Sequence, residues 1–156
     1  MKEHHLAQCN VATMLADADD PVMAGFFERL DELNALADNS PGFIWRLQED
    51  DGDATAIRVF DNPRILFNLS VWESAEALEV YVYRSDHVSA VRRRMSWFEP
   101  ATRSPLVLWW IPAGRLPDVE EARQRLELLW QGGPQPAAFT FSKRFAADGT
   151  PAQGVE

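Results

Sequence analysis

The stretch RILFNLSVW, residues 64–72, decides the fold of this chain. Phe67 and Leu69 are apolar, whereas Asn68 between them is polar, and this alternation is typical of a β-strand whose two faces differ. The same period recurs in HLAQCNVATM, residues 5–14. Two such strands predict a sheet with one apolar face and one polar face.

Helical patterns separate the predicted strands. Asp20-Pro21 is typical of a helix start and precedes apolar residues at helical spacing. Ser74 and Asp118 are the predicted caps of two more helices, and Glu121 completes a capping-box pattern after Asp118. Further strands are predicted in GFIWRLQ (42–48), PLVLWWIP (105–112) and AAFTFSKRF (137–145).

The element order predicts an α+β fold with a ferredoxin-like antiparallel sheet and helices on one face. We expect residues 4–145 to form a single domain and residues 146–156 to be a disordered tail. The predicted elements leave the second sheet face without an obvious cover. A second copy of the chain, sheet against sheet, is the economical cover, so the sequence predicts a homodimer.

Composition excludes several classes of partner. The formal net charge is −9, which argues against nucleic-acid binding. No apolar run is long enough for a membrane span and the N-terminus lacks a signal-peptide pattern, so we expect a cytoplasmic protein. Three histidines and one cysteine make a structural metal site improbable. Cys9 is interpreted as a small buried apolar residue, with a reactive thiol as the alternative.

The polar strand face carries the first candidate site. Amides, an arginine and a hydroxyl occupy it instead of the Lys, Glu and Thr of an ordinary solvated sheet. Such groups suit a partly enclosed cavity that orients a small molecule, and the alternative is a polar dimer interface with trapped water. Asn10, Arg46 and Asn68 are therefore candidates to hold a ligand oxygen, with Trp72 at the margin.

YRSDHVSAVRRRMSWFEP, residues 83–100, carries the second group of candidates. On a helical wheel its three consecutive arginines face three directions, so they do not form one basic patch. His87 and Arg94 share one edge of the helix, and Tyr83 lies one turn before His87. We interpret this edge as the rim of a cavity, with His87 in acid–base chemistry or, alternatively, in packing. Trp97 and Trp110 are further candidates to line the cavity.

Several motifs together resemble an uncharacterised domain-of-unknown-function family similar to the antibiotic-biosynthesis-monooxygenase superfamily. They are SPGFIWRLQ, LFNLSVWES, YRSDHxxAxRRRxxWF, LVLWWIPAG and GPxPxAFTF. The resemblance implies a ferredoxin-like dimeric α/β barrel. It also implies relatives that include cofactor-independent monooxygenases, haem proteins and proteins that merely bind small molecules. His87, Arg94, Trp97 and Trp110 belong to the family pattern, which carries no established catalytic residue.

Three functions remain open at this point. The first is an enzyme without a cofactor, with monooxygenase-like or related proton-transfer chemistry, that acts on an apolar or aromatic metabolite. Asn10, Arg46 and Asn68 would hold an enolate or carbonyl oxygen, and His87 would exchange a proton. The second is a non-catalytic module that binds a ligand or a partner. The third is a haem protein with His87 as the axial ligand.

Overall fold

The computed structural model describes residues 4–17, 19–47, 64–89, 97–100 and 102–152, and for residues 83–89 it describes the backbone. Its elements follow the predicted order closely. They are β1 (His4–Thr13), the 3-10 turn η1 (Pro21–Met23), α1 (Ala24–Asp38), β2 (Phe43–Arg46), β3 (Ile65–Trp72), α2 (Ala75–Ser89), β4 (Leu106–Pro112), α4 (Val119–Gly132), β5 (Arg144–Phe145) and β6 (Pro151–Ala152).

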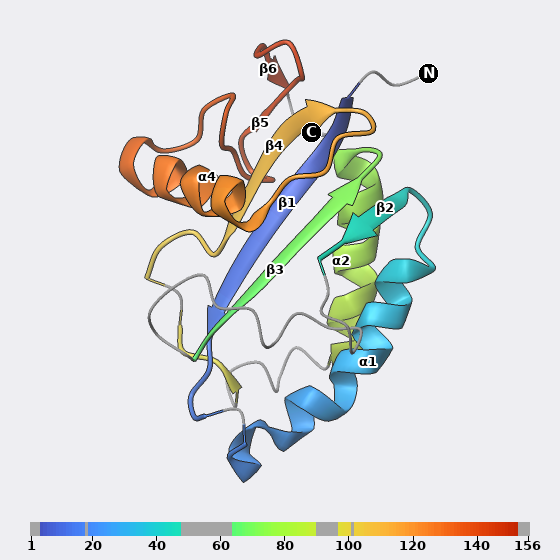
Figure 1. Ribbon diagram of the computed structural model, residues 1–156, viewed down its shortest axis with the longest axis vertical. Helices are drawn as coiled ribbons and strands as arrows, with labels where there is room; N and C mark the ends of the chain where they lie inside the picture. The colour runs from blue at the N-terminus through green and yellow to red at the C-terminus, as the bar shows by residue number, and fades with distance from the viewer. Residues whose placement is uncertain (1–3, 18, 48–63, 90–96, 101, 153–156) are drawn as a thin grey trace.

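Within the described residues, the main sheet has four antiparallel strands in the order β2-β3-β1-β4. With α1 between β1 and β2 and α2 between β3 and β4, this is the ferredoxin-like α+β fold that the sequence predicts. The two central strands are β1 and β3, and Gln8 lies opposite Ser70 in their register (Figure 1). β3, which contains most of the stretch RILFNLSVW, is thus one of the two central strands of the sheet.

The apolar face of the sheet packs against α4. This helix starts at Asp118, whose side chain accepts a hydrogen bond from the Glu121 backbone N–H at 2.8 Å, as the capping pattern predicts. Its buried side chains meet the apolar strand residues in one cluster. The cluster contains Ala7, Cys9, Phe67, Leu69, Val71, Val107, Trp109 and Ile111 from the strands and Ala122, Leu126 and Leu129 from α4.

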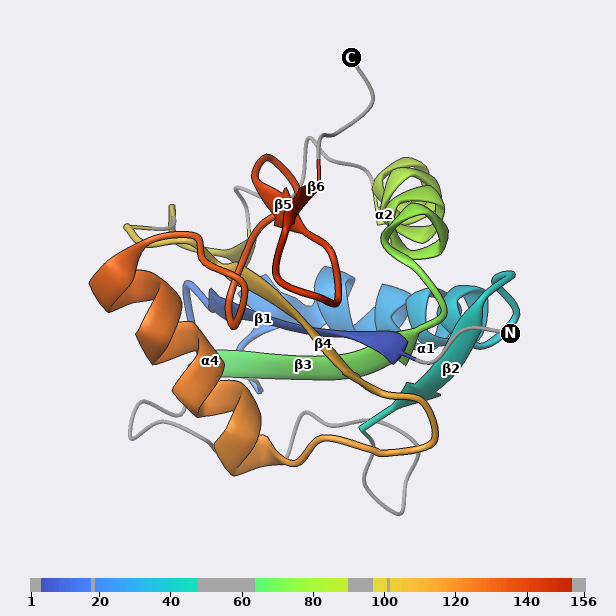
Figure 2. The same ribbon diagram turned by 90° about the horizontal axis from the view of Figure 1, so that it is seen from above.

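The polar face lies on the same side as α2. Leu78 of α2 packs with Leu6 and Trp72 from this face, and α1 packs beside α2 (Figure 2). The sequence predicts helices on one sheet face and a second copy of the chain over the other. α1 and α2 lie on one face, and the apolar stripe of α4 packs on the other face within the same chain.

A bulge in β2 also changes a predicted alignment. The sequence places Phe43 and Trp45 on one face, but the register shifts between them. Phe43 then lies opposite Trp72 on the polar face, whereas Trp45 joins the apolar cluster. The extra residue of a bulge reverses the alternation of a strand, so Arg46 also lies on the polar face, opposite Ser70.

The C-terminal segment is less regular than the sequence predicts. Instead of a strand over 137–145, a single bridge joins Leu108 to Phe139, and β5 pairs with β6. Pro134 and Pro136 precede this segment and lack the N–H groups that a continuous ladder needs. Residues 146–152, expected to be part of a disordered tail, hold a turn and β6. No helix in the described part of the chain is long and apolar enough to span a membrane.

Candidate ligand-binding site

The polar face of the sheet is built from four cross-strand rows, which we name by their side chains. The aromatic row is Phe43, Trp72, Leu6 and Trp110; the polar row is Arg46, Ser70, Gln8 and Leu108; the amide row is Asn68, Asn10 and Leu106; the aliphatic row is Leu66 and Ala12. Each row follows from strand register, so the sequence patterns of four separate strands produce one ordered surface.

The aromatic row closes one end of this surface. Trp72 is 1% exposed and its ring stacks on that of Tyr81 from α2, with ring centroids 5.1 Å apart. Phe43 meets the Trp72 ring edge-on at 5.3 Å. Trp110 donates its indole N–H to the Phe145 carbonyl at 2.7 Å. These contacts hold the aromatic rings in place on the side of α2.

The polar row is buried and internally hydrogen-bonded. Gln8 is 4% exposed, and its Nε2 donates to Ser70 Oγ and to Asn68 Oδ1, each at 2.7 Å. The Trp72 indole donates to the same Ser70 Oγ at 2.8 Å. A buried polar group is tolerated when it is paired, and here the pairs connect the aromatic row to the amide row.

Arg46 meets a carboxylate from α1. Its Nε lies 2.8 Å from Asp38 Oδ1, and Asp38 is the last residue of α1. Tyr81 lies within reach of both charges: burial raises the pKa of its hydroxyl, Arg46 lowers it and Asp38 raises it, with a net upward shift. Tyr81 is therefore a neutral donor at ordinary pH. The anion that a mid-strand arginine needs is supplied by the protein itself.

The amide row is open to solvent. Asn68 is exposed and Asn10 is half-buried, although both lie on the two central strands and on the same side as α2. The aromatic row and its helix contacts lie on one side. On the other side, Leu66 packs against a cluster built around Met14, Met23 and Trp97. One exposed and one half-buried amide thus lie between two apolar clusters, an arrangement suited to an apolar molecule that carries a polar oxygen.

The other sequence-predicted residues are distributed as follows. Trp97 is 6% exposed and packs edge-on against Phe26, with ring centroids 5.8 Å apart. The side chains of Tyr83 and His87, in the last turns of α2, and the whole of Arg94 lie outside the described residues. The structure therefore brings Asn10, Asn68 and Trp72 together on one face, with Arg46 and Trp110 at its margins.

Sequence reasoning missed residues that complete the site. The sequence predicts Gln8 and Ser70 on the polar face but not as site residues, and it predicts no role for Asp38 and Tyr81. The available signal for Tyr81 was its position in the apolar stripe of a helix that directly follows β3. No such signal existed for Asp38, because its pairing with Arg46 depends on the turn between α1 and β2.

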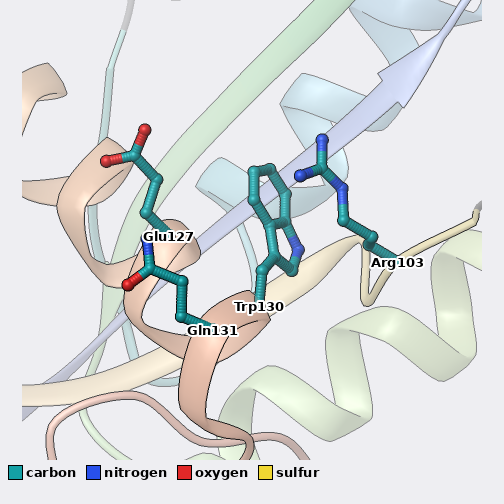
Figure 3. Close-up of a pocket in the computed structure, with 4 residues that line it drawn as sticks. All are labelled: Arg103, Glu127, Trp130 and Gln131. Atoms are coloured by element: carbon teal, nitrogen blue, oxygen red, sulfur yellow. The ribbon is translucent and has the colours of Figure 1, made fainter.

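A cleft lies away from the amide row, between α4 and the segment that precedes β4. It measures about 280 Å³ and is lined by Arg103, Glu127, Trp130 and Gln131 (Figure 3). The Arg103 guanidinium stacks 3.8 Å from the centre of the Trp130 ring, whose indole donates to the Ser104 carbonyl at 2.8 Å. None of the predicted site residues lines this cleft. Within the described residues, no group of three His, Cys, Asp or Glu side chains is placed to hold a metal ion.

The fold and the site define a ferredoxin-like α+β protein with a solvent-accessible row of amides on its sheet. The chain belongs to the family described as domain of unknown function DUF3291, whose model matches residues 5–154. A comparison with curated proteins finds no match.

Solved structures with similar shapes come from several bacteria. One is SnoaB from Streptomyces nogalater, described as a cofactor-independent oxygenase, with a TM-score of 0.43 and 15% identity over 75% of this chain and 100% of that one. NE2512 from Nitrosomonas europaea, a protein of unknown function, has a TM-score of 0.44 and 12% identity over 74% and 97%. PA3566 from Pseudomonas aeruginosa has a TM-score of 0.41 and 16% identity over 72% and 95%. Likenesses at this level assign no activity to the present chain.

Proposed function

We propose that this protein binds an apolar or aromatic metabolite that carries a carbonyl or enolate oxygen, and that it catalyses proton transfer next to that oxygen. The observation that carries the proposal is the exposed Asn68 in the middle of the central strand pair. An exposed amide between two apolar clusters, backed by a buried polar row, suits one ring system and one oxygen.

The residues have distinct proposed roles. Asn68 and Asn10 hold the ligand oxygen and stabilise charge that develops on it. Trp72 and Trp110 support the aromatic end of the site. Arg46 acts indirectly, because its guanidinium is engaged by Asp38. His87 is the proposed proton acceptor, with Tyr83 and Arg94 at the rim as predicted from the sequence. Trp97, which packs against Phe26, supports the apolar cluster at that end.

Oxygenation is the finer form of this proposal, and it needs O2 but no cofactor. After a proton leaves the carbon beside the carbonyl, the electron-rich substrate itself reduces O2. A CH2 group becomes a new carbonyl, one oxygen atom stays in the product, and the other leaves as water. The protein contributes deprotonation and charge stabilisation, both within reach of amides and a histidine.

The test uses 2-acetylnaphthalene, a ring system with a single ketone, and isothermal titration with the full chain. We expect binding that weakens at least about tenfold in Asn68→Ala, because the amide donates to the ketone. Gln124→Ala removes an exposed amide from α4, on the other side of the sheet, and should bind as the unchanged protein does. Equal affinity for both variants would contradict the proposal.

Catalysis is tested separately from binding. Deuterium from heavy water should enter the methyl group of bound 2-acetylnaphthalene, and His87→Ala should slow this exchange. Binding without exchange would favour the non-catalytic module. A Soret band with added haemin that disappears in His87→Ala would favour the haem protein instead.

The homodimer and the cytoplasmic location remain predictions. Half-buried Val11, Trp45 and Leu47 lie on the apolar face and pack at the edge of the α4 cluster, and they are the proposed dimer contacts. Light scattering should give a particle of twice the 17.7 kDa chain mass. A 17.7 kDa particle would refute the dimer without affecting the binding proposal.

A further inference from the structure

The hydrogen bonds of Gln8 determine which way the Asn68 amide faces. Gln8 Nε2 lies 2.7 Å from both Asn68 Oδ1 and Ser70 Oγ. An amide nitrogen carries two protons, so this geometry uses both of them. At the other end of the network the Trp72 indole, which can donate but cannot accept, binds Ser70 Oγ at 2.8 Å.

The opposite orientation of Gln8 is less favourable. If its amide were turned over, its oxygen would face Asn68 and Ser70, and its two protons would face away from both. Gln8 is 4% exposed, so each proton would then need a new buried acceptor. Buried N–H groups without a partner are rarer and more costly than partly satisfied carbonyls.

Fixing Gln8 also fixes Asn68. The Asn68 carbonyl oxygen points inward to accept from Gln8, which leaves its amide nitrogen on the exposed side. The exposed end of Asn68 is then a hydrogen-bond donor with two protons. The nearby Arg46 is paired with Asp38, so this selectivity depends on donor geometry more than on a net positive charge.

We infer that Gln8 is a positioning residue that makes the exposed end of Asn68 a hydrogen-bond donor, and that the site therefore selects ligands by an oxygen acceptor. The preferred ligands are aromatic ketones, enolates and phenolates, and amine analogues of the same shape are rejected. This inference rests on the proposed function for its ligand, but the orientation of the two amides can be measured without any ligand.

The orientation is tested by NMR on the 15N-labelled full chain, with side-chain amides assigned through Asn68→Asp and Gln8→Met. We expect the Gln8 side-chain protons to exchange slowly with water and those of Asn68 to exchange fast. Slow exchange at Asn68 together with fast exchange at Gln8 would overturn the inference, whatever the protein binds.

Selectivity is tested with 2-acetylnaphthalene against 1-(2-naphthyl)ethylamine, which has a similar skeleton and an amine in place of the ketone. The unchanged protein should prefer the ketone by about tenfold or more. In Gln8→Glu the new side chain can accept from Asn68, so Asn68 should turn its oxygen outward and the preference should disappear or reverse. Gln8→Met adds no charge, frees the Asn68 amide and should lower the preference.

Gln124→Glu is the matched control, because it makes the same chemical change on the exposed surface of α4. It should keep the preference of the unchanged protein. An unchanged preference in folded Gln8→Glu and Gln8→Met would overturn the positioning role while the proposed function stands. If the exchange pattern is as expected but neither probe binds, the proposed function fails and the amide orientation stands.

Discussion

At the scale of single residues, polar groups in the interior are held by short hydrogen-bonded sets. Glu121 is an example on the apolar side of the sheet. Its carboxylate accepts from the Trp109 indole at 2.9 Å and pairs with Arg115. Burial raises the pKa of Glu121, but the hydrogen bonds from Arg115 and Trp109 and the charge of Arg115 outweigh it, so the pKa is lowered.

This lowered pKa predicts a pH dependence of stability. Above the ordinary glutamate pKa of about 4.3, the ionised Glu121 stabilises the folded state, and the contribution is lost as pH falls through the lowered folded-state pKa. We expect Glu121→Gln to lower the free energy of unfolding by about 1–2 kcal/mol at pH 7. The difference from the unchanged protein should shrink below pH 4 in urea unfolding curves.

Glu120→Gln is the control for this prediction, since Glu120 is on the same helix with a more exposed side chain. It should cost less than about 0.5 kcal/mol at either pH. A Glu121→Gln deficit that stays constant down to pH 3 would contradict the assignment of the stabilising charge to Glu121.

Cys9 shows the other outcome of burial, which is loss of reactivity. It is 0% exposed among apolar neighbours, and burial raises the pKa of its thiol far above the ordinary value. Because the thiolate is the reactive form, a thiol reagent such as DTNB should label the native protein at the rate of unfolding. Labelling should be fast in 6 M guanidinium. Rapid labelling of the native protein would show that Cys9 is accessible.

At the scale of elements, the turn between α1 and β2 decides how closely the helices approach. Gly42 has φ +84°, and a Cβ placed there would lie 2.5 Å from the Ala77 Cβ of α2. The position therefore demands both a left-handed backbone and the absence of a side chain. This turn also brings Asp38 to Arg46.

Gly114 provides a matched comparison for Gly42. Its φ is +91°, but an added Cβ meets nothing within 4 Å. We expect Gly114→Ala to lower the free energy of unfolding by about 1–2 kcal/mol because of backbone strain. Gly42→Ala should lower it by the same amount plus roughly 1–3 kcal/mol for the clash with α2. Equal costs in chemical denaturation would show that α2 moves away without penalty.

Most elements could be predicted from local sequence, and the exceptions have identifiable physical causes. Alternation defined β1 and β3, and Asp118 defined the start of α4. The bulge in β2 could not be predicted, because Ile44 fits either face of a strand equally well. The prediction of a strand over 137–145 is wrong, because a β-strand needs a partner strand as well as β-propensity. Residues 140–143 pair with no strand in the described part of the chain.

At the scale of the whole molecule, one sheet separates an apolar layer with α4 from a layer with α1 and α2 (Figure 2). The sequence predicts Asn10 and Asn68 as site residues, and it does not predict which helices lie on their side of the sheet. That depends on α4, whose stripe of Ala122, Leu126 and Leu129 needed an apolar surface. The hydrogen bond between Gln8 and Asn68 joins residues 60 positions apart in the sequence. Local sequence patterns do not determine which residues of two such distant strands lie opposite each other.

We place the ligand site at the amide row, and the cleft lined by Arg103 and Trp130 is the competing place on the molecule for the same ligand. The measurement is a chemical-shift titration of the 15N-labelled chain with 2-acetylnaphthalene. We predict that the largest shifts occur at Asn10, Asn68 and the Gln8 side chain, and that Asn68→Ala abolishes them. The opposite result would be that the largest shifts occur in the cleft lined by Arg103, Trp130 and Gln131 (Figure 3). That result would show that the ligand does not bind at the amide row.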